Sequence, residues 1–296
     1  IQARVVGSLT ADGFGSVTPV GLLGGSNGTM PSAAELSFAG VDPTKFSIIV
    51  TNGIIGSSII SKFVEFGAKY GRPVFWDIPN VDNYYAAKQY RDSVVASEFQ
   101  ACMWKSDFRT VGNKKYAVYP SIKLAKAYAS MFQKTGTLNY PPAGFTYGSV
   151  SVEELLETDS DLFPAELKIA KINYITKKAA GAVIWEHRTG YGLESDLSYL
   201  STVFTHLSLS SEMKNFTDNF PFKYVTSDLL VLLDSGLRDI AARYRANNFV
   251  WSCEVVIPSF AEVKKNGARS MVVGVNVKYA EDGQEYELQF HLKATA

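Results

Sequence analysis

The segment from Phe46 to Pro79 constrains the fold most, because a strand pattern, a helix pattern and a second strand pattern follow one another in it. Phe46–Val50 is a short apolar run with β-branched residues, which is typical of a buried strand. The helix pattern is an apolar face with three- and four-residue spacing: Ile59, Ile60, Phe63, Val64 and Tyr70. Val74–Pro79 is the second strand pattern. Such a βαβ unit pairs its two strands in parallel, so the sequence predicts an α/β fold.

The rest of the first 189 residues continues this alternation. We expect helices over 84–98 and 122–133, short helical pieces over 152–156 and 164–170, a strand over 116–120 and a loop over 139–144. Lys171–Thr189 is predicted to form a strand, a short turn and a second strand. These elements predict a mixed sheet with flanking helices as a first domain over residues 1–189.

The sequence after Thr189 is typical of a smaller α+β domain over residues 190–296, with a soft boundary. A helix is expected over 199–213. Thr226 and Ser227 can cap a longer helix of about twenty residues. Its apolar stripe is Leu230, Leu233, Leu237, Ile240 and Tyr244. Two alternating runs, Met271–Tyr279 and Tyr286–Leu292, flank the turn Glu281–Gly283 and predict a terminal β-hairpin with one buried face.

Composition excludes several function classes. The 296 residues carry 29 Lys and Arg against 29 Asp and Glu, so the formal charge is zero and the basic excess of a nucleic-acid binder is missing. Apolar residues make up 46%, which is an ordinary globular balance, and no apolar run approaches the ~18 residues of a membrane helix. Cys102 and Cys253 have no metal-ligand spacing and cannot form a disulfide framework.

The glycine-rich stretch Gly21–Thr29 does not fit a phosphate-binding loop. A P-loop needs a lysine immediately before its Ser or Thr, and Asn27–Gly28 stands there instead. The stretch also does not join a strand to a helix, as a dinucleotide-binding turn does. A structural turn is the better interpretation.

Few residues are candidates for catalysis or metal binding. The chain has three histidines, His187, His206 and His291, and no spacing that brings them together. Strand alternation would place Glu186 and Arg188 opposite His187, which favours a surface or interface ion pair over a general base. Cys102 is interpreted as a core thiol.

Two further features leave alternatives open. Asp77, at the carboxyl end of the second predicted strand, is the carboxylate best placed to bind a ligand, although no second acid lies nearby in the sequence. Aromatic residues also lie in loop-like stretches, where they favour either a broad contact surface or small clusters under loops. They are Tyr84, Tyr85, Phe108, Tyr140, Phe145, Tyr147, Phe216, Phe220, Phe222 and Tyr224.

Five short motifs, in the same order, resemble those of contractile phage tail sheath proteins. They are a glycine turn (Gly24, Gly25, Gly28), an apolar strand with Asp-x-Pro (Trp76, Asp77, Pro79), a Tyr-Pro strand end (Tyr119, Pro120), a Pro-Pro-x-Gly loop (Pro141, Pro142, Gly144) and the final strand pair (Asn173, Gly181, Trp185, Arg188, Thr189). The chain departs from the family pattern in having Asn27 for Asp, Glu186 for Gly, and an altered approach, Lys105–Lys115, to the Tyr-Pro motif. It is similar to a divergent member of the family.

The resemblance implies a structural protein rather than an enzyme. Sheath subunits stack as rings of six in a helical lattice around a tail tube, and the lattice contracts to drive delivery of a genome or an effector. The expected partners are other copies, the tail tube protein, the baseplate and the tail terminator, with no cofactor, no direct nucleic-acid contact and no membrane insertion. The expected location is the virion tail, assembled in the host cytoplasm. Terminal arms of such proteins add a strand to a neighbour's sheet.

Two other function classes stay open, and each has a discriminating observation. A surface adhesin or other interaction domain would use the aromatic residues and would bind glycans or receptors as a monomer. An α/β enzyme would use Asp77 beside a substrate-sized cleft. Under the sheath hypothesis one or both arms can be absent from this chain, which begins with Ile1 and stops soon after its hairpin, so we expect it to be monomeric or weakly associated.

Overall fold

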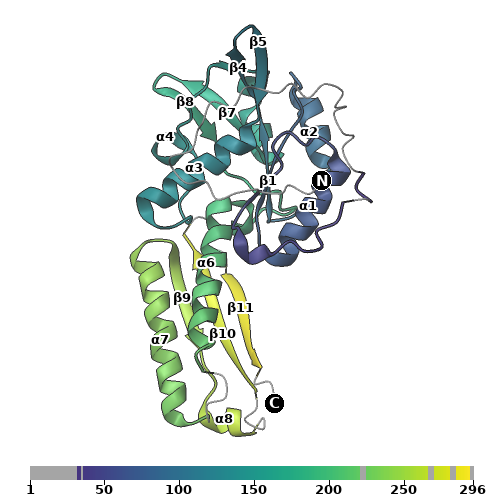
Figure 1. Cartoon of the computed structure of the whole chain (residues 1–296). Helices are drawn as coiled ribbons and strands as arrows, with labels where there is room; N and C mark the ends of the chain where they lie inside the picture. Colours follow the sequence, from purple (N-terminus) through teal and green to yellow (C-terminus); the bar gives the residue numbers. More distant parts are fainter. Residues whose placement is uncertain (1–31, 35, 221–224, 266–269, 281–284, 294–296) are drawn as a thin grey trace, which may run out of the picture.

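The computed structural model describes residues 32–34, 36–220, 225–265, 270–280 and 285–293, the last range as backbone only. Figure 1 shows an α/β part and, below it, a second part built from two long helices and a sheet. The helix α6 (Leu200–Thr217) runs from one part into the other.

A five-stranded mixed sheet lies at the centre of the α/β part, in the order β1-β2-β3-β7-β8. Its strands are β1 (Ile49–Val50), β2 (Val74–Asp77), β3 (Gln100–Trp104), β7 (Ile172–Lys178) and β8 (Gly181–Trp185). β1, β2, β3 and β7 run parallel to one another, whereas β8 is antiparallel to β7. The predicted βαβ unit and the predicted strand pair over 171–189 are both confirmed.

Helices cover both faces of this sheet, which explains why its strands are apolar on both sides. α1 (Ser57–Tyr70), α2 (Tyr84–Asp92) and α5 (Pro164–Ile169) pack against the face that includes Trp76 and Trp104. α3 (Pro120–Thr135) and the first turns of α6 pack against the face that includes Phe75 and Met103. The result is a three-layer core.

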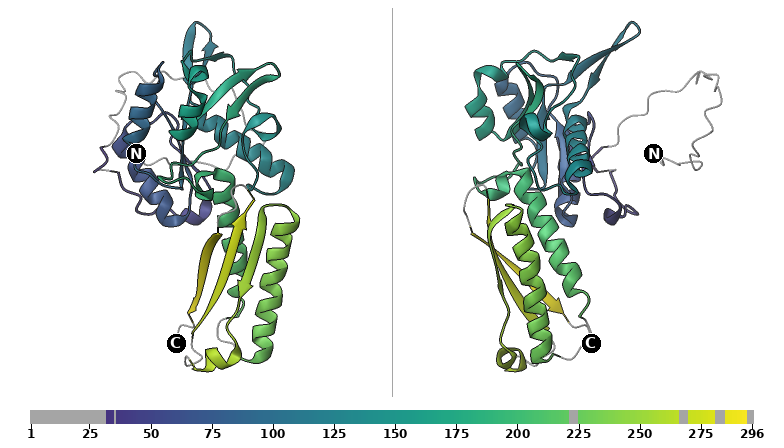
Figure 2. Two further views of the ribbon diagram at one scale, coloured as in Figure 1. Left: turned by 180° about the vertical axis from the view of Figure 1, so that it is seen from behind. Right: turned by 90° about the vertical axis from the view of Figure 1, so that its left-hand side faces the viewer.

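A small antiparallel sheet, in the order β5-β4-β6, projects from the α/β part (Figure 2). It consists of β4 (Asp107–Val111), β5 (Lys114–Val118) and β6 (Glu154–Leu155), and the short helix α4 (Gly144–Tyr147) precedes β6. The expectation of a helical piece over 152–156 is wrong. The backbone N–H groups of Glu153 and Glu154 donate to the buried Asp107 carboxylate, and Glu154–Leu155 pair with β4.

Other expectations also differ from the structure, among them the end of the strand expected over 116–120, which lies at Val118. The helix expected over 84–98 ends at Asp92, where the Ser93 hydroxyl donates to the Tyr90 carbonyl and closes the last turn. Tyr70, which is expected on the apolar face of α1, is exposed because it lies in the last turn of the helix. Its ring packs against the Phe66 ring.

The second part combines α6, α7 (Ser227–Ala246) and a sheet in the order β11-β10-β9. Its strands are β9 (Val250–Val256), β10 (Ser270–Tyr279) and β11 (Glu285–Lys293), and α8 (Phe260–Lys265) lies between β9 and β10. The Thr226 hydroxyl accepts from the Leu229 N–H, so the predicted cap of α7 is confirmed. The predicted hairpin is confirmed as β10 and β11, although its turn lies outside the described residues.

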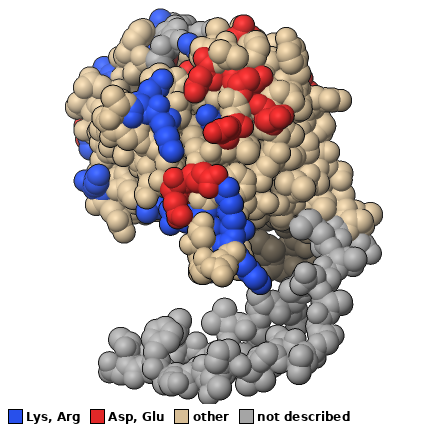
Figure 3. Space-filling model, turned by 90° about the horizontal axis from the view of Figure 1, so that it is seen from above, with Lys and Arg blue, Asp and Glu red and all other residues tan. Residues whose placement is uncertain are grey.

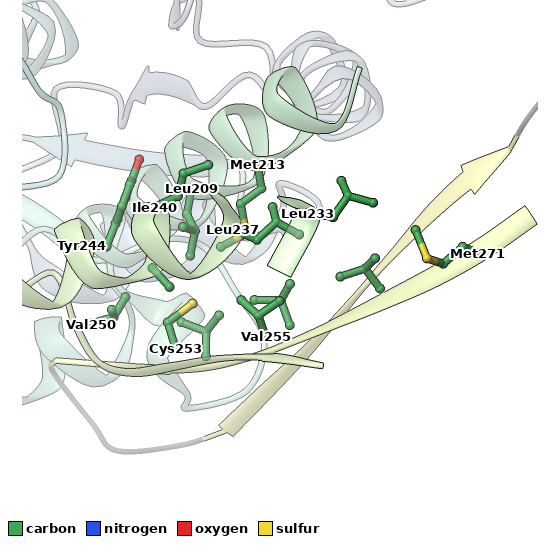
Figure 4. Packing of buried hydrophobic residues seen from close by; sticks show 14 of the residues in the cluster. Leu209, Met213, Leu233, Leu237, Ile240, Tyr244, Val250, Cys253, Val255 and Met271 are labelled. Atoms are coloured by element: carbon green, nitrogen blue, oxygen red, sulfur yellow. The ribbon is translucent and has the colours of Figure 1, made fainter. Parts of the chain in front are cut away.

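The predicted apolar stripe of α7 forms the middle of the second core. Figure 4 shows Leu233, Leu237 and Ile240 between Leu209 and Met213 of α6 and the inward side chains of β9. Alternate residues of β10, among them Val273, Val275 and Val277, complete this core. Each fully buried aliphatic side chain of this kind contributes about 2 kcal/mol.

α6 contributes to both cores. Leu200 and Phe204 lie among the residues beneath the five-stranded sheet, whereas Leu209 and Met213 lie in the second core. The Pro-Pro loop adds a second link, because Asn139 accepts from Ser208 of α6 and the Tyr140 ring contacts Phe249 at 5.1 Å. A division into domains at Thr189 stays a prediction.

Candidate functional site

Asp77 lies at the carboxyl end of β2, as expected, but its carboxylate is buried and already occupied. It accepts hydrogen bonds from the Gly53 N–H (2.9 Å), the Ser121 N–H (2.7 Å) and the Ser121 hydroxyl (2.6 Å). Burial raises the pKa of this carboxyl above its usual value, and these three hydrogen bonds oppose the shift. Asp77 therefore joins the loop after β1 to the start of α3 through hydrogen bonds within the subunit.

The Tyr-Pro motif forms the start of α3. Tyr119 is the N-cap residue, and Pro120 occupies the first helical position, where its missing N–H costs nothing. The Tyr119 ring lies over Gly53, at which an added Cβ would come within 2.2 Å of the ring. Asp77, Tyr119 and Pro120 thus meet at one junction between β1, β2 and α3. Pro79, two residues after Asp77, lies half-buried in the loop that leaves β2.

A second junction joins β3, β7 and the segment after β8. The Asn173 side chain is fully buried and binds three backbone groups. Its Nδ2 donates to the carbonyls of Cys102 (3.0 Å) and Arg188 (2.8 Å), and its Oδ1 accepts from the Arg188 N–H (2.5 Å). Thr189 is also buried, and its hydroxyl donates to the Leu197 carbonyl. Asn173 therefore fixes the path of the chain as it leaves the sheet.

The expected ion pair between Glu186 and Arg188 is present, but Arg188 is buried within the subunit and does not lie on its exposed surface. Its guanidinium pairs with Glu194, lies 3.6 Å from Glu186 and stacks 4.2 Å from the Tyr199 ring centre. β8 ends at Trp185, and Glu186 has a φ of +67°. The strand alternation on which the expectation depended therefore stops before Glu186.

Lys171 holds the same loop from the other side. Its ammonium donates to the carbonyls of Tyr191 and Leu193 and to the Ser198 hydroxyl. Burial lowers the pKa of this lysine, and Glu194 opposes the shift. Sequence reasoning missed Lys171 because nothing in its local pattern distinguishes a buried lysine from an exposed one.

Five other motif residues occupy turns or covered positions. Gly181 has a φ of +126° at the turn of the β7–β8 hairpin, and Gly144 has a φ of +67° where α4 begins. Pro142 is buried and Pro141 half-buried in the loop before α4. Trp185 is half-buried beneath the Lys178 ammonium, 4.7 Å from its ring centre. Gly24, Gly25 and Gly28 lie outside the described residues.

A further buried ion pair was not predicted. Asp107 accepts from Lys123 Nζ at 2.8 Å and from Arg109 Nε at 3.1 Å, as well as from the N–H groups of Glu153 and Glu154. Burial alone would raise the pKa of the Asp107 carboxyl, but the hydrogen bonds from Lys123, Glu153 and Arg109 outweigh it and hold the pKa below its usual value. This pair anchors the small sheet to α3.

The cysteines and histidines described here form no reactive cluster. Cys102 is buried, and burial raises the pKa of its thiol to about 11, which agrees with a core thiol. The His187 ring lies against Tyr199, and His206 is far from His187 along the chain. The side chain of His291 is not among those that the structure describes. Among the described residues, no group of three His, Cys, Asp or Glu could hold a metal ion.

The aromatic residues divide between the two expected roles. Tyr84 stacks on Phe163, Tyr140 packs on Tyr147, and Phe216 packs on Phe220 beside the second core. Tyr85 and Phe145 are exposed. Phe222 and Tyr224 lie outside the described residues. Most of the rings that the structure describes therefore pack in small clusters.

His206 gives the second part an expected pH dependence. Its Nδ1 lies 2.9 Å from the Tyr279 hydroxyl, and burial lowers the pKa of the imidazole below 6.5. The unfolded chain takes up the proton first, so stability is complete above about pH 7 and falls as the pH drops through 6.5 toward the lower folded pKa. His206→Gln should remove this loss, because the amide does not titrate. Urea unfolding between pH 5 and 7.5 measures it, and His187→Gln, the matched control, should retain it.

No helix within the described ranges is long and apolar enough to cross a membrane. Both signs of charge occur on the face of the α/β part seen in Figure 3.

No protein-family model matches the sequence, and no curated protein matches it. Solved structures do match, and they define the class: the fold is that of contractile tail sheath proteins. A chain of an extracellular contractile injection system, the PVC sheath complex in its contracted state, is 16% identical with a TM-score of 0.65, over 82% of this chain and 70% of that one.

Two further structures are similar. A chain of the anti-feeding prophage baseplate is 16% identical with a TM-score of 0.59, over 79% of this chain and 64% of that one. The sheath tail protein of Desulfitobacterium hafniense is 11% identical with a TM-score of 0.57, over 84% of this chain and 56% of that one. This chain therefore spans less than two thirds of the length of both proteins. At these identities the likeness shows the fold.

Proposed function

We propose that this chain is a structural subunit of a contractile tail sheath, which works by packing against copies of itself and not by catalysis. The observation that carries the proposal is the likeness to the PVC sheath chain, which extends over 82% of this chain. The buried motif residues support it, because the polar groups of Asp77, Asn173 and Arg188 form hydrogen bonds and ion pairs within the subunit.

The finer expectations follow from this role. Copies stack as rings of six in a helical lattice around a tail tube, between a baseplate and a tail terminator. The lattice contracts to drive delivery of a genome or an effector. The assembly requires no cofactor, nucleic-acid contact or membrane insertion, and it forms in the host cytoplasm before it acts as part of a virion tail or an injection machine.

The second sheet supplies a route for self-assembly. β9 and β11 are the edge strands of the described three-stranded sheet, so each can pair with a strand from a neighbouring subunit. Val256 of β9 is exposed beside Gly274 of β10. A charge on this edge strand should therefore oppose strand addition.

Negative-stain electron microscopy tests the proposal, with the chain alone and with any natural sequence that flanks it. Hollow tubes with a regular helical repeat are the expected result for the extended protein. Val256→Lys should shorten or abolish them, whereas Val111→Lys, at an exposed valine in the small sheet, should not. Compact monomers of the extended protein at every salt and protein concentration would overturn the sheath role and favour a monomeric binding domain.

A further inference from the structure

One groove of the α/β part combines an apolar floor with a basic rim. It has a volume of about 320 Å³ and lies between α3, α4 and the neighbouring strand segments. Ile122, Met131 and Val150 contribute apolar lining, and Arg109, Lys126 and Lys134 contribute the basic groups. We call this the α3 groove. A ligand that fits it must supply both aliphatic side chains and negative charge.

The charges of the α3 groove are only partly neutralised by the subunit itself. Arg109 shares Asp107 with Lys123, and its side chain is 45% exposed. Lys126 and Lys134 are exposed, and neither forms an ion pair with any residue that the structure describes. The rim therefore keeps a positive potential that an acidic partner would meet.

The outer face of α7 has the complementary character. Asp228, Val231, Leu232, Ser235 and Asp239 recur at three- and four-residue spacing and form one stripe, which we call the α7 stripe. Val231 is 68% exposed and Leu232 is 52% exposed. Within the described ranges Asp228 and Asp239 have no ion-pair partner, whereas Asp234 beside them pairs with Arg238 at 2.8 Å. The stripe presents two aliphatic side chains between two free carboxylates.

The two surfaces lie on different parts of the molecule, the groove on the α/β part and the stripe on the second part. Figure 1 shows the first turns of α7 beside α8, at the end of the second part farthest from α3 and α4. One subunit therefore cannot place its own α7 stripe in its own α3 groove. A second copy can, and the same contact then leaves a free stripe and a free groove for further copies.

We propose that the α7 stripe of one subunit docks in the α3 groove of the next. Val231 and Leu232 enter the apolar floor, and Asp228 and Asp239 face the lysines of the rim. The contact is heterologous, so repetition produces a ring or a helical row rather than a closed dimer. This inference rests on the proposed sheath role and specifies one contact within that lattice.

Directional cross-linking tests the contact. The native cysteines Cys102 and Cys253 are buried, so thiols introduced at the surface can be addressed selectively. Ser130→Cys places a thiol in the α3 groove, and Ser235→Cys places one on the α7 stripe. A short bismaleimide should join the two variants when they are mixed, but should not join either variant to itself.

Charge exchange provides the matched control. Lys126→Glu combined with Lys134→Glu should reduce the yield of cross-linked pairs more than about tenfold, because acids then face acids. Asp228→Lys combined with Asp239→Lys in the partner should restore it. Sedimentation should show association that weakens between 50 and 500 mM salt, as about a threefold shorter screening length requires.

The failure of this contact is distinguishable from failure of the sheath role. Regular tubes without a Ser130→Cys to Ser235→Cys cross-link would overturn the docking and leave the sheath role intact. A cross-link that survives the Lys126 and Lys134 reversals would overturn the charge complementarity, and symmetric cross-links of either variant to itself would overturn the heterologous geometry. Absence of both tubes and cross-links would overturn both proposals.

Discussion

Asn173→Ala should lower the free energy of unfolding of the α/β part by about 3 kcal/mol, because it leaves buried backbone groups without their partner. The side chain is fully buried and binds the Cys102 carbonyl and both backbone groups of Arg188. Guanidinium denaturation followed by tryptophan fluorescence measures the change, since Trp76, Trp104 and Trp185 all lie in the central sheet.

Asn276→Ala is the matched control for this prediction. Asn276 also lies in a strand, but it is exposed on β10. Its backbone lies opposite Glu254 of β9 and Glu287 of β11 in the sheet. Its substitution should change stability by less than about 0.5 kcal/mol. Equal effects of the two variants would contradict the assignment of Asn173 as the residue that fixes the chain after β8.

Lys123→Met should lower the free energy of unfolding by about 3 kcal/mol, because Asp107 then stays buried without its main cation. Asp107 is fully buried, the Lys123 side chain is 7% exposed, and the ammonium lies 2.8 Å from the carboxylate. Thermal unfolding followed by circular dichroism measures the loss. Lys126→Met, one turn away at an exposed position of the same helix, should change little.

The double variant Asp107→Asn with Lys123→Met separates a lost attraction from an isolated charge. It should be more stable than Lys123→Met alone, because no uncompensated carboxylate remains. The pKa of Asp107 is held below 3.8, so its contribution is present above that pH and is lost as the pH falls through the folded pKa. A double variant less stable than the single one would show that the ion pair itself is not the source of the effect.

The sequence predicted the helices and strands best where local periodicity and burial agree. The stripe of α7 and the alternation of β10 both face a single core, so the pattern of apolar residues is also the pattern of contacts. The prediction of a helical piece over 152–156 is wrong because the strand that forms there depends on Asp107, more than forty residues earlier. Such long-range partners leave no signal in a local window.

The residues of the candidate junctions could be found in the sequence, but their roles could not. Asp77 and Asn173 were selected from motifs, yet only the fold shows that each binds backbone groups from distant segments. The expectation of a surface or interface position for Arg188 extends strand alternation three residues beyond Trp185, past the positive φ of Glu186. Lys171 and Lys123 were missed because burial of a lysine is set by tertiary structure alone.

The continuity of α6 determines how a subunit can respond to force. One helix has its first turns embedded beneath the five-stranded sheet and its later turns embedded beneath α7, with no break between Leu200 and Thr217. Bending the molecule at its middle would require the helix to fracture and one of the two cores to open. A force applied at one end of the subunit is therefore transmitted to the other end without bending at the middle. When the surroundings of the subunit change, we expect it to tilt or slide as one piece, while the contacts between molecules yield.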